Sequence, residues 1–274
     1  GEPGKPIVID GHGSTLTGAD PIDPDHWEDL GDGLYRSDSL YQKTSHGKHL
    51  TDESINAVVG RYFFLFDRQP QRMDRSPKGN NQPFKQPDQL QSGEWTFIRQ
   101  SDQEPVFYLR IDPDTKLSDH NIEAPLRSNG VAIYGQRCEH LVIRNITAKH
   151  FYNDGVNIHG TTRDIHIENF TAIECGDDGI SAHDDCHVEI NGFTSIGNST
   201  GMCHVGHSQT TTRNMVIRDC HGVDLYLLNG SRHHIEDSIV LTSGHRAIMI
   251  VGGPTESDIC DVTLDNVLLS LIHI

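Results

Sequence analysis

The chain has 274 residues, of which 35% are hydrophobic, and its formal net charge at pH 7 is −17. An acidic surface repels phosphate groups, so we expect neither nucleic acid nor an anionic membrane as a partner. The sequence contains no apolar run of the ~18 residues that a transmembrane helix needs, and it therefore predicts no membrane span.

Residues 1–18 predict the first coil of a repetitive β structure. Within them, GKPIVIDGHGSTLTG combines a short apolar strand, a Gly-rich turn and a second apolar pair. The sequence stops in VTLDNVLLSLIHI, which is also strand-like. Because both ends fall within predicted strands, we expect the natural chain to continue on each side, with any export signal before Gly1.

Residues 19–125 break this pattern and predict a β-rich insertion that packs beside the coils. The stretch 58–75, VVGRYFFLFDRQPQRMDR, predicts a hairpin. The loop 76–91 is rich in Pro, Gln and Asn and could either roof a groove or serve only as structure. Two aromatic-rich strands follow, in GEWTFI and EPVFYLRID.

Residues 126–274 carry a repeat. The phrase NDGVNIHG is followed by DDGISAHD, and the pairs Asp154-Gly155 and Asp178-Gly179 lie 24 residues apart. A period in the low twenties, with short β-branched runs and no helical pattern, is typical of a parallel β-solenoid. We therefore predict an all-β chain built as a parallel β-helix.

Each predicted coil contributes two strands whose alternate residues face inward. The first strand is expected to point inward at Ile143, Ile167, Ile190, Ile217, Ile235 and Leu264. The next residues are expected to face solvent, namely Arg144, Glu168, Asn191, Arg218, Glu236 and Asp265. Left-handed backbone at a tight bend, which Asn, Asp and Gly tolerate, is then expected at Asn145, Asn169, Gly192, Asp219, Asp237 and Asn266.

The second strand of each coil follows the same alternation. Its inward residues are expected to be Val156/Ile158, Ile180/Ala182, Met202/His204, Leu225/Leu227 and Ile248/Ile250. Its outward residues are expected to be Asn157/His159, Ser181/His183, Cys203/Val205, Tyr226/Leu228 and Met249/Val251. This outward face is polar and aromatic over several coils, which suits the binding of an extended polymer.

The repeated Asp residues are the candidate catalytic groups. Stacked coils lie about 4.8 Å apart, so Asp154 should approach the pair Asp177 and Asp178. Three carboxyl groups this close cannot all ionise freely, and at least one pKa should rise. A protonated acid beside an ionised base is what glycoside hydrolysis requires. The alternative is that each Asp-Gly pair is only turn chemistry at a coil corner.

Further side chains on the same face are candidate substrate-binding residues, namely Asn157, His159, Ser181, His183, His204 and Tyr226. His159 and His183 share one outward column and could bind sugar hydroxyls, shuttle a proton or, with Asp residues, hold a metal. Tyr226 offers a flat surface to a sugar ring. Strict alternation buries His204, whereas a slip of one residue would expose it.

The six cysteines show no CxxC spacing, so we expect no zinc site. Buried thiols inside the coils and one or two disulfides of an exported protein both remain open.

Residues 129–269 resemble the right-handed parallel β-helix proteins of the pectin-lyase-like superfamily. Within that superfamily, NDG followed 23 residues later by GDDG is similar to the catalytic pattern of polygalacturonases and of β-helical α-1,3-galactosidases. The resemblance implies an inverting displacement around Asp154, Asp177 and Asp178. The chain departs from the polygalacturonase pattern in three ways. It has Ser199-Thr200-Gly201 where those enzymes carry GHG, no RIK motif, and Gly179 in place of the usual Cys.

Three functions are compatible with the sequence. The first is a secreted or periplasmic, monomeric glycoside hydrolase that needs no cofactor or metal and acts on an α-linked galactose- or uronate-containing polysaccharide or oligosaccharide. The second is a polysaccharide lyase or uronate epimerase, with Lys149, His159 and His183 as candidate bases and Ca²⁺ as the candidate cation. The third is a non-catalytic carbohydrate-binding or adhesion β-helix. An acidic groove would repel a polyanion, which favours the first, but fold alone decides nothing.

Overall fold

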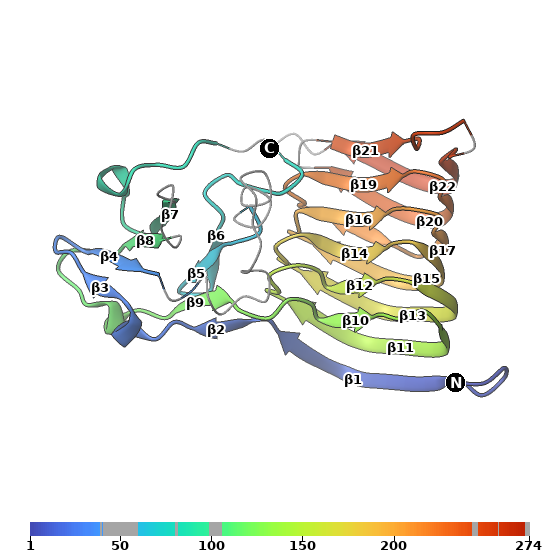
Figure 1. Ribbon diagram of the computed structural model, residues 1–274, viewed down its shortest axis with the longest axis horizontal. Helices are drawn as coiled ribbons and strands as arrows, with labels where there is room; N and C mark the ends of the chain where they lie inside the picture. The colour runs from blue at the N-terminus through green and yellow to red at the C-terminus, as the bar shows by residue number, and fades with distance from the viewer. Residues whose placement is uncertain are drawn as a thin grey trace.

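The chain forms a parallel β-solenoid with an antiparallel β insertion at its side (Figure 1). The computed structural model describes residues 1–38, 40, 60–79, 82–98, 106–242, 246–256 and 258–271. Its short 3₁₀ segments are Pro24–His26, Pro87–Gln89 and Leu117–Asp119. Within the described part of the chain, no helix has the length and apolar character that a membrane crossing requires. The prediction of an all-β parallel solenoid is confirmed.

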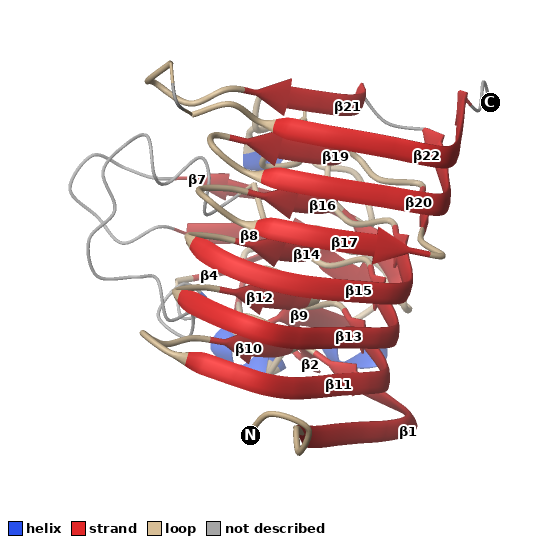
Figure 2. Cartoon of the chain, turned by 90° about the vertical axis from the view of Figure 1, so that its right-hand side faces the viewer, coloured by secondary structure: helices blue, strands red, loops and turns tan. Residues whose placement is uncertain are grey.

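Two parallel sheets run along the stack of coils, and Figure 2 shows their strands lying side by side. The eight-stranded sheet contains β1 (Ile7–Thr17), β11 (Cys138–Lys149), β13 (Thr161–Ile173), β15 (Asp185–Ile196), β17 (Gln209–Arg213), β18 (Val216–Arg218), β20 (Arg232–Thr242) and β22 (Asp261–Leu271). The six-stranded sheet contains β10 (Val131–Ile133), β12 (Val156–Ile158), β14 (Asp178–Ala182), β16 (Thr200–His204), β19 (Val223–Leu228) and β21 (Arg246–Val251). We call these the long and the short sheet.

The pairing of the long sheet confirms the predicted first-strand column except at one coil. The confirmed members are Ile143, Ile167, Ile190, Ile235 and Leu264. Between Ile190 and Ile235 the column passes through Thr212, so the prediction of Ile217 is wrong. Ile217 instead pairs with Ser195 and Val240 in the second half of the strand.

The corner of this coil lies at Asn214, whose φ is 54°, and here the strand is divided into β17 and β18. A threonine occupies the place of the usual isoleucine, so a search for apolar residues moves on to the next isoleucine. The outward residue of this coil is consequently Arg213 and not Arg218.

The coil corners have the backbone that their residue types predict. The φ angle lies between 47° and 75° at Asn145, Asn169, Gly192, Asp219, Asp237 and Asn266. Asn214 has the same conformation and takes the corner position of its own coil. The expectation of left-handed backbone is therefore confirmed, but the place of Asp219 in this column is wrong, because it follows Arg218, which pairs with Ile196.

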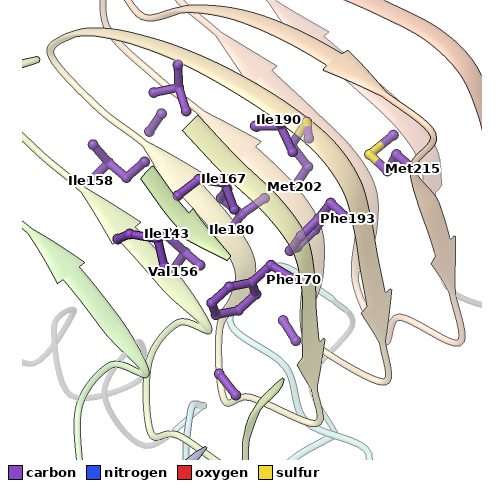
Figure 3. Close-up of a cluster of buried hydrophobic side chains, with 14 of the residues drawn as sticks. Ile143, Val156, Ile158, Ile167, Phe170, Ile180, Ile190, Phe193, Met202 and Met215 are labelled. Atoms are coloured by element: carbon purple, nitrogen blue, oxygen red, sulfur yellow. The ribbon is translucent and has the colours of Figure 1, made fainter. Parts of the chain in front are cut away.

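The core lies between the two sheets and is filled by inward side chains of both (Figure 3). In the short sheet, strand pairing connects Val156, Ile180, Met202, Leu225 and Ile248, as the alternation predicts, and it extends this column to Val131. Phe170 and Phe193 stack in successive coils with ring centroids 6.4 Å apart. Each fully buried side chain of this size contributes about 1.5–3 kcal/mol.

In the last coil two residues of the predicted inward columns keep much of their surface exposed, Leu264 at 39% and Ile250 at 49%. Their strands β22 and β21 end the order of the described sheets, so no further described strand covers them.

The insertion forms two four-stranded antiparallel sheets beside the coils (Figure 1). One contains β2 (Ala19–Pro21), β9 (Ile122–Pro125), β5 (Phe64–Phe66) and β6 (Gln69–Gln71). The other contains β3 (Glu28–Asp29), β4 (Leu34–Ser37), β8 (Val106–Arg110) and β7 (Glu94–Ile98). The β5–β6 pair and the β7–β8 pair are the predicted hairpin and aromatic strands, whose residues 58–59 and 104–105 lie outside the described part.

A separate aromatic core holds the insertion together, with Trp95 and Phe107 at its centre. It reaches the solenoid at Tyr62, whose ring lies 5.1 Å from that of Tyr152 in an edge-on arrangement. This contact fixes the insertion close to the coil corners that carry the repeated Asp residues.

The six cysteines are free thiols, and four of them are buried, namely Cys175, Cys186, Cys203 and Cys220. Burial raises the pKa of the Cys175 thiol to about 12, so this group stays protonated.

Candidate active site

The Asp-Gly turns lie where the chain enters the short sheet. Asp154 comes two residues before β12, and Asp178 is the first residue of β14. A glycine is needed after Asp154 because a Cβ at Gly155 would lie 2.5 Å from the Cβ of Ala172 and 2.6 Å from the carbonyl oxygen of Gly179. Close stacking of the coils therefore explains why glycine follows each Asp. The Asp residues themselves line a cavity.

The carboxyl groups of Asp154, Asp177 and Asp178 meet on the wall of this cavity. One oxygen from each lies within 4.8 Å of the others. All three residues are buried, with exposed fractions between 1% and 4%. The cavity has a volume of about 480 Å³ and is also lined by side chains of the insertion.

Asp154 is held by neutral donors. Its Oδ1 accepts a hydrogen bond from the backbone N–H of Asp178 at 3.0 Å. Its Oδ2 accepts from Ser181 Oγ at 2.7 Å and from the side-chain amide of Asn157. Burial and the negative charge of Asp177 raise the pKa of Asp154 above its ordinary value.

Asp177 is surrounded by positive charge. Its Oδ2 accepts from Arg61 Nε at 2.8 Å and lies 2.7 Å from Arg61 Nη2, while its Oδ1 accepts from Lys78 Nζ at 2.6 Å. Burial disfavours its ionised form, but the charges of Lys78 and Arg61 outweigh burial and lower the pKa of Asp177 to about 2.

Asp178 receives less compensation. Its Oδ1 accepts from Lys78 Nζ at 2.5 Å. Burial and the charge of Asp177 nevertheless raise its pKa well above the ordinary value, against the influence of Lys78. The pKa values of these adjacent carboxyl groups are thus shifted in opposite directions, downward for Asp177 and upward for Asp178.

Three planar side chains from successive coils form one rim of the cavity. Tyr134 follows β10, His159 follows β12 and His183 follows β14. The His159 and His183 rings are stacked with centroids 4.2 Å apart and planes 5° apart, and Tyr134 lies 5.4 Å from His159. Burial and the neighbouring His159 lower the pKa of His183 to about 4, so its imidazole is neutral at pH 7.

Most of the residues proposed from the sequence line this cavity, namely Asp154, Asp177, Asp178, Asn157, His159, His183 and Tyr226. Ser181 lies behind them, fully buried, and donates to Asp154. His204 is buried inside the coil, as strict alternation predicts. Its Nδ1 accepts a hydrogen bond from the backbone N–H of Ala182 at 3.1 Å. Lys149 lies in the long sheet and is not among the residues that line the cavity.

Sequence reasoning missed several lining residues, namely Arg61, Pro77, Lys78, Ser128, Asn129, Tyr134 and Asn153. The strand alternation that identified Asn157 would have found Tyr134 one coil earlier, because it follows β10 as His159 follows β12. Arg61 and Lys78 belong to the insertion, and no spacing connects them to the repeat. The loop 76–91, expected either to roof a groove or to serve only as structure, places Pro77 and Lys78 on the cavity wall, and its residues 80–81 lie outside the described part.

Clustered carboxyl groups can attract a metal ion, but here the ammonium of Lys78 lies against two of the three, and we assign no metal to them. On the outer face of the long sheet, His234, Glu236 and Asp265 each bring one ligand atom within 4.8 Å of the others. Arg213 already forms an ion pair with Glu236 there, and the group is partly open to solvent.

No family model and no curated protein matches the chain. Among solved structures it is similar to one described as "The complex structure of XylC with xylose", with a TM-score of 0.41 and 9% sequence identity. The match covers 90% of this chain and 60% of that one, so the chain spans less than two thirds of the length of XylC.

Proposed function

We propose that the chain is a carbohydrate-active enzyme, a glycoside hydrolase that cleaves an α-linked galactose- or uronate-containing glycan by carboxylate acid–base catalysis. One observation supports this above the others: three buried carboxyl groups in unequal electrostatic surroundings meet on the wall of a cavity of about 480 Å³. An acid and a base whose pKa values are separated by their surroundings are what this reaction needs.

Asp178 is the proposed acid. It gives its proton to the glycosidic oxygen as the bond between that oxygen and the anomeric carbon breaks. Asp154, which no cation contacts among the described residues, takes the proton of the water that attacks the anomeric carbon. Asp177 stays ionised and stabilises the positive charge that develops on the sugar ring.

The rest of the cavity suits sugar hydroxyls. The side-chain oxygen of Asn157 is buried and has no hydrogen-bond partner among the described residues, so it is available to accept from a hydroxyl. The neutral imidazole of His183, stacked on His159, offers a donor and an acceptor nearby.

A lyase or epimerase is the second candidate, and Lys78 and Arg61 favour it. The acidic composition argues against a polyanionic substrate, but these two cations balance the local carboxylates. A uronate carboxylate would therefore meet less repulsion here than the net charge of −17 suggests. Such an enzyme would use a residue such as His159 as base, with Ca²⁺ as the candidate cation.

Assays on a glycan panel separate these functions. New reducing ends without ultraviolet absorbance indicate a hydrolase, and unsaturated products that absorb in the ultraviolet indicate a lyase. We expect Asp178→Asn to lower the rate of glycan cleavage about 10²–10⁴-fold, the usual contribution of a general acid.

Asp237→Asn is the matched control, since it places at one coil corner the residue type that other corners carry, and its rate should stay at the wild-type level. Cleavage that survives in Asp178→Asn would remove the assigned acid. Binding without cleavage by the wild-type protein would leave the carbohydrate-binding module as the function.

A further inference from the structure

Residues 60–79 of the insertion lie along the corners of several coils, and we call them the strap. They include β5 and β6, whose sheet lies between the sheet of β3, β4, β7 and β8 and the coils (Figure 1). The buried guanidinium of Arg72 donates to the carbonyl oxygens of Cys175 at 2.8 Å and Gly197 at 3.3 Å, which belong to successive coils. The Oγ atoms of Ser76 and Ser199 are 2.6 Å apart and share a hydrogen bond.

These anchors place two cations of the strap at the carboxyl cluster. Arg61 lies 116 residues before Asp177 in sequence, and Lys78 lies 99 and 100 residues before Asp177 and Asp178. The side chains of Lys78 and Arg61 are only 20% and 24% exposed. Their charges are therefore poorly screened by water and act strongly on the neighbouring carboxyl groups.

The cations are distributed unequally over the three acids. Both oxygens of Asp177 face a cation and one oxygen of Asp178 does, whereas the hydrogen-bond partners of Asp154 among the described residues are neutral donors. The ammonium of Lys78 donates to both neighbours, Asp177 and Asp178. Asp177 is thus contacted by two cations, Asp178 by one, and Asp154 by none among the described residues.

We propose that Lys78, assisted by Arg61, is a positioning residue of this site: it fixes negative charge on Asp177 and leaves the exchangeable proton to the Asp178–Asp154 pair. The inference deepens the proposed hydrolase function and rests on it where catalysis is concerned. The insertion is then part of the active site, because the repeat supplies the carboxyl groups and the strap decides which of them is charged.

The test compares the wild-type protein with Lys78→Met, which removes the charge and leaves an unbranched side chain that is one atom shorter than lysine. The carboxyl groups of the three residues are followed by carbon-13 NMR from pH 3 to 9, with Asp→Asn variants assigning the signals. In the wild-type protein the Asp177 signal should be that of a carboxylate across this range. In Lys78→Met its titration should move upward by about one pH unit or more, as expected when a neighbouring cation is lost.

Activity provides the second reading. On a glycan that the protein cleaves, the acidic limb of the pH profile of kcat/KM should move to higher pH in Lys78→Met and return toward wild type in Lys78→Arg. Lys85→Met is the matched control. Lys85 belongs to the same insertion, but its ammonium lies 2.5 Å from Glu94 Oε1 and does not line the cavity of the carboxyl cluster. Lys85→Met should change neither the titration nor the profile.

The outcomes separate this inference from the proposed function. A shifted titration in a protein that cleaves no glycan supports the role of Lys78 and overturns the hydrolase. An active protein whose titration and pH profile are the same in Lys78→Met overturns the role of Lys78. If Lys78→Met does not fold, the wild-type titration still decides, since three carboxyl groups that titrate together would contradict the inference.

Discussion

At the scale of single residues, Asn198 illustrates how one buried side chain joins two coils. Its Oδ1 accepts from the backbone N–H of Cys175 at 2.7 Å, and its Nδ2 donates to the carbonyl of Ala172 at 3.1 Å. Asn198→Ala removes both hydrogen bonds and takes the acceptor from the backbone N–H of the buried Cys175, so we expect a loss of about 2–3 kcal/mol in the free energy of unfolding by urea. Asn191→Ala, an exposed change on the same coil, should cost about 0.5 kcal/mol or less. Equal losses in the two variants would show that the hydrogen bonds of Asn198 are not what stabilises this corner.

The candidate site shows what a sequence can and cannot predict at this scale. The approach of Asp154 to Asp177 follows from the repeat alone, because stacking converts one period of sequence into one coil spacing. Lys78 and Arg61 carry no such signal. Their contacts depend on how the insertion packs on the coils, through side chains such as Tyr62, and this tertiary packing is not encoded in any local pattern.

At the scale of the structural element, left-handed residues at the coil corners lie within the strands of the long sheet. Asn169 has a φ of 47°, and the equivalent position of the next coil is Gly192. An Ala in left-handed backbone places its Cβ against the following carbonyl, so Asn169→Ala should lower the free energy of unfolding by about 1 kcal/mol. Asn169→Gly avoids that clash and should stay within about 0.5 kcal/mol of wild type by urea titration. If the two variants lose the same amount, the side-chain contact to Asn145 matters more than the backbone.

The same scale explains the one error in the predicted register. Most coils mark the inward column of the first strand with isoleucine, and there the apolar pattern gives the correct register. The coil of β17 has Thr212 at this place, and its next isoleucine, Ile217, belongs to the following strand segment. A search for hydrophobic residues does not detect a polar residue in an inward column. The corner residue Asn214, in contrast, is of the Asn, Asp or Gly type that the sequence predicts at corners.

At the scale of the whole molecule, the protein has two hydrophobic cores, one inside the solenoid and one inside the insertion. The solenoid core depends on short-range alternation and is therefore readable from the repeat. The aromatic core of the insertion involves residues as distant in sequence as Trp27 and Tyr152. The site lies where the two parts meet, so the fold class is predictable from the sequence, whereas the charge balance of the site follows from the assembled molecule.

The acid stability of the whole molecule should depend on histidines buried in the solenoid. His204 and His233 are 0% and 1% exposed, and burial lowers the pKa of His233 from 6.5 to about 4 and that of His204 well below 6.5. The unfolded chain binds more protons than the folded one below pH 6.5, so this stability is complete above pH 6.5 and is lost as the pH falls toward 4. Each imidazole contributes up to about 1.4 kcal/mol per pH unit in that window. Unfolding free energies are measured by urea at pH 7.5, 6 and 5. They should fall less steeply with falling pH in His233→Leu than in wild type, because the variant lacks this imidazole. The carboxyl groups titrate in both proteins and contribute equally to both curves. Parallel curves for the two proteins would mean that His233 is already protonated, or solvated, in the folded state.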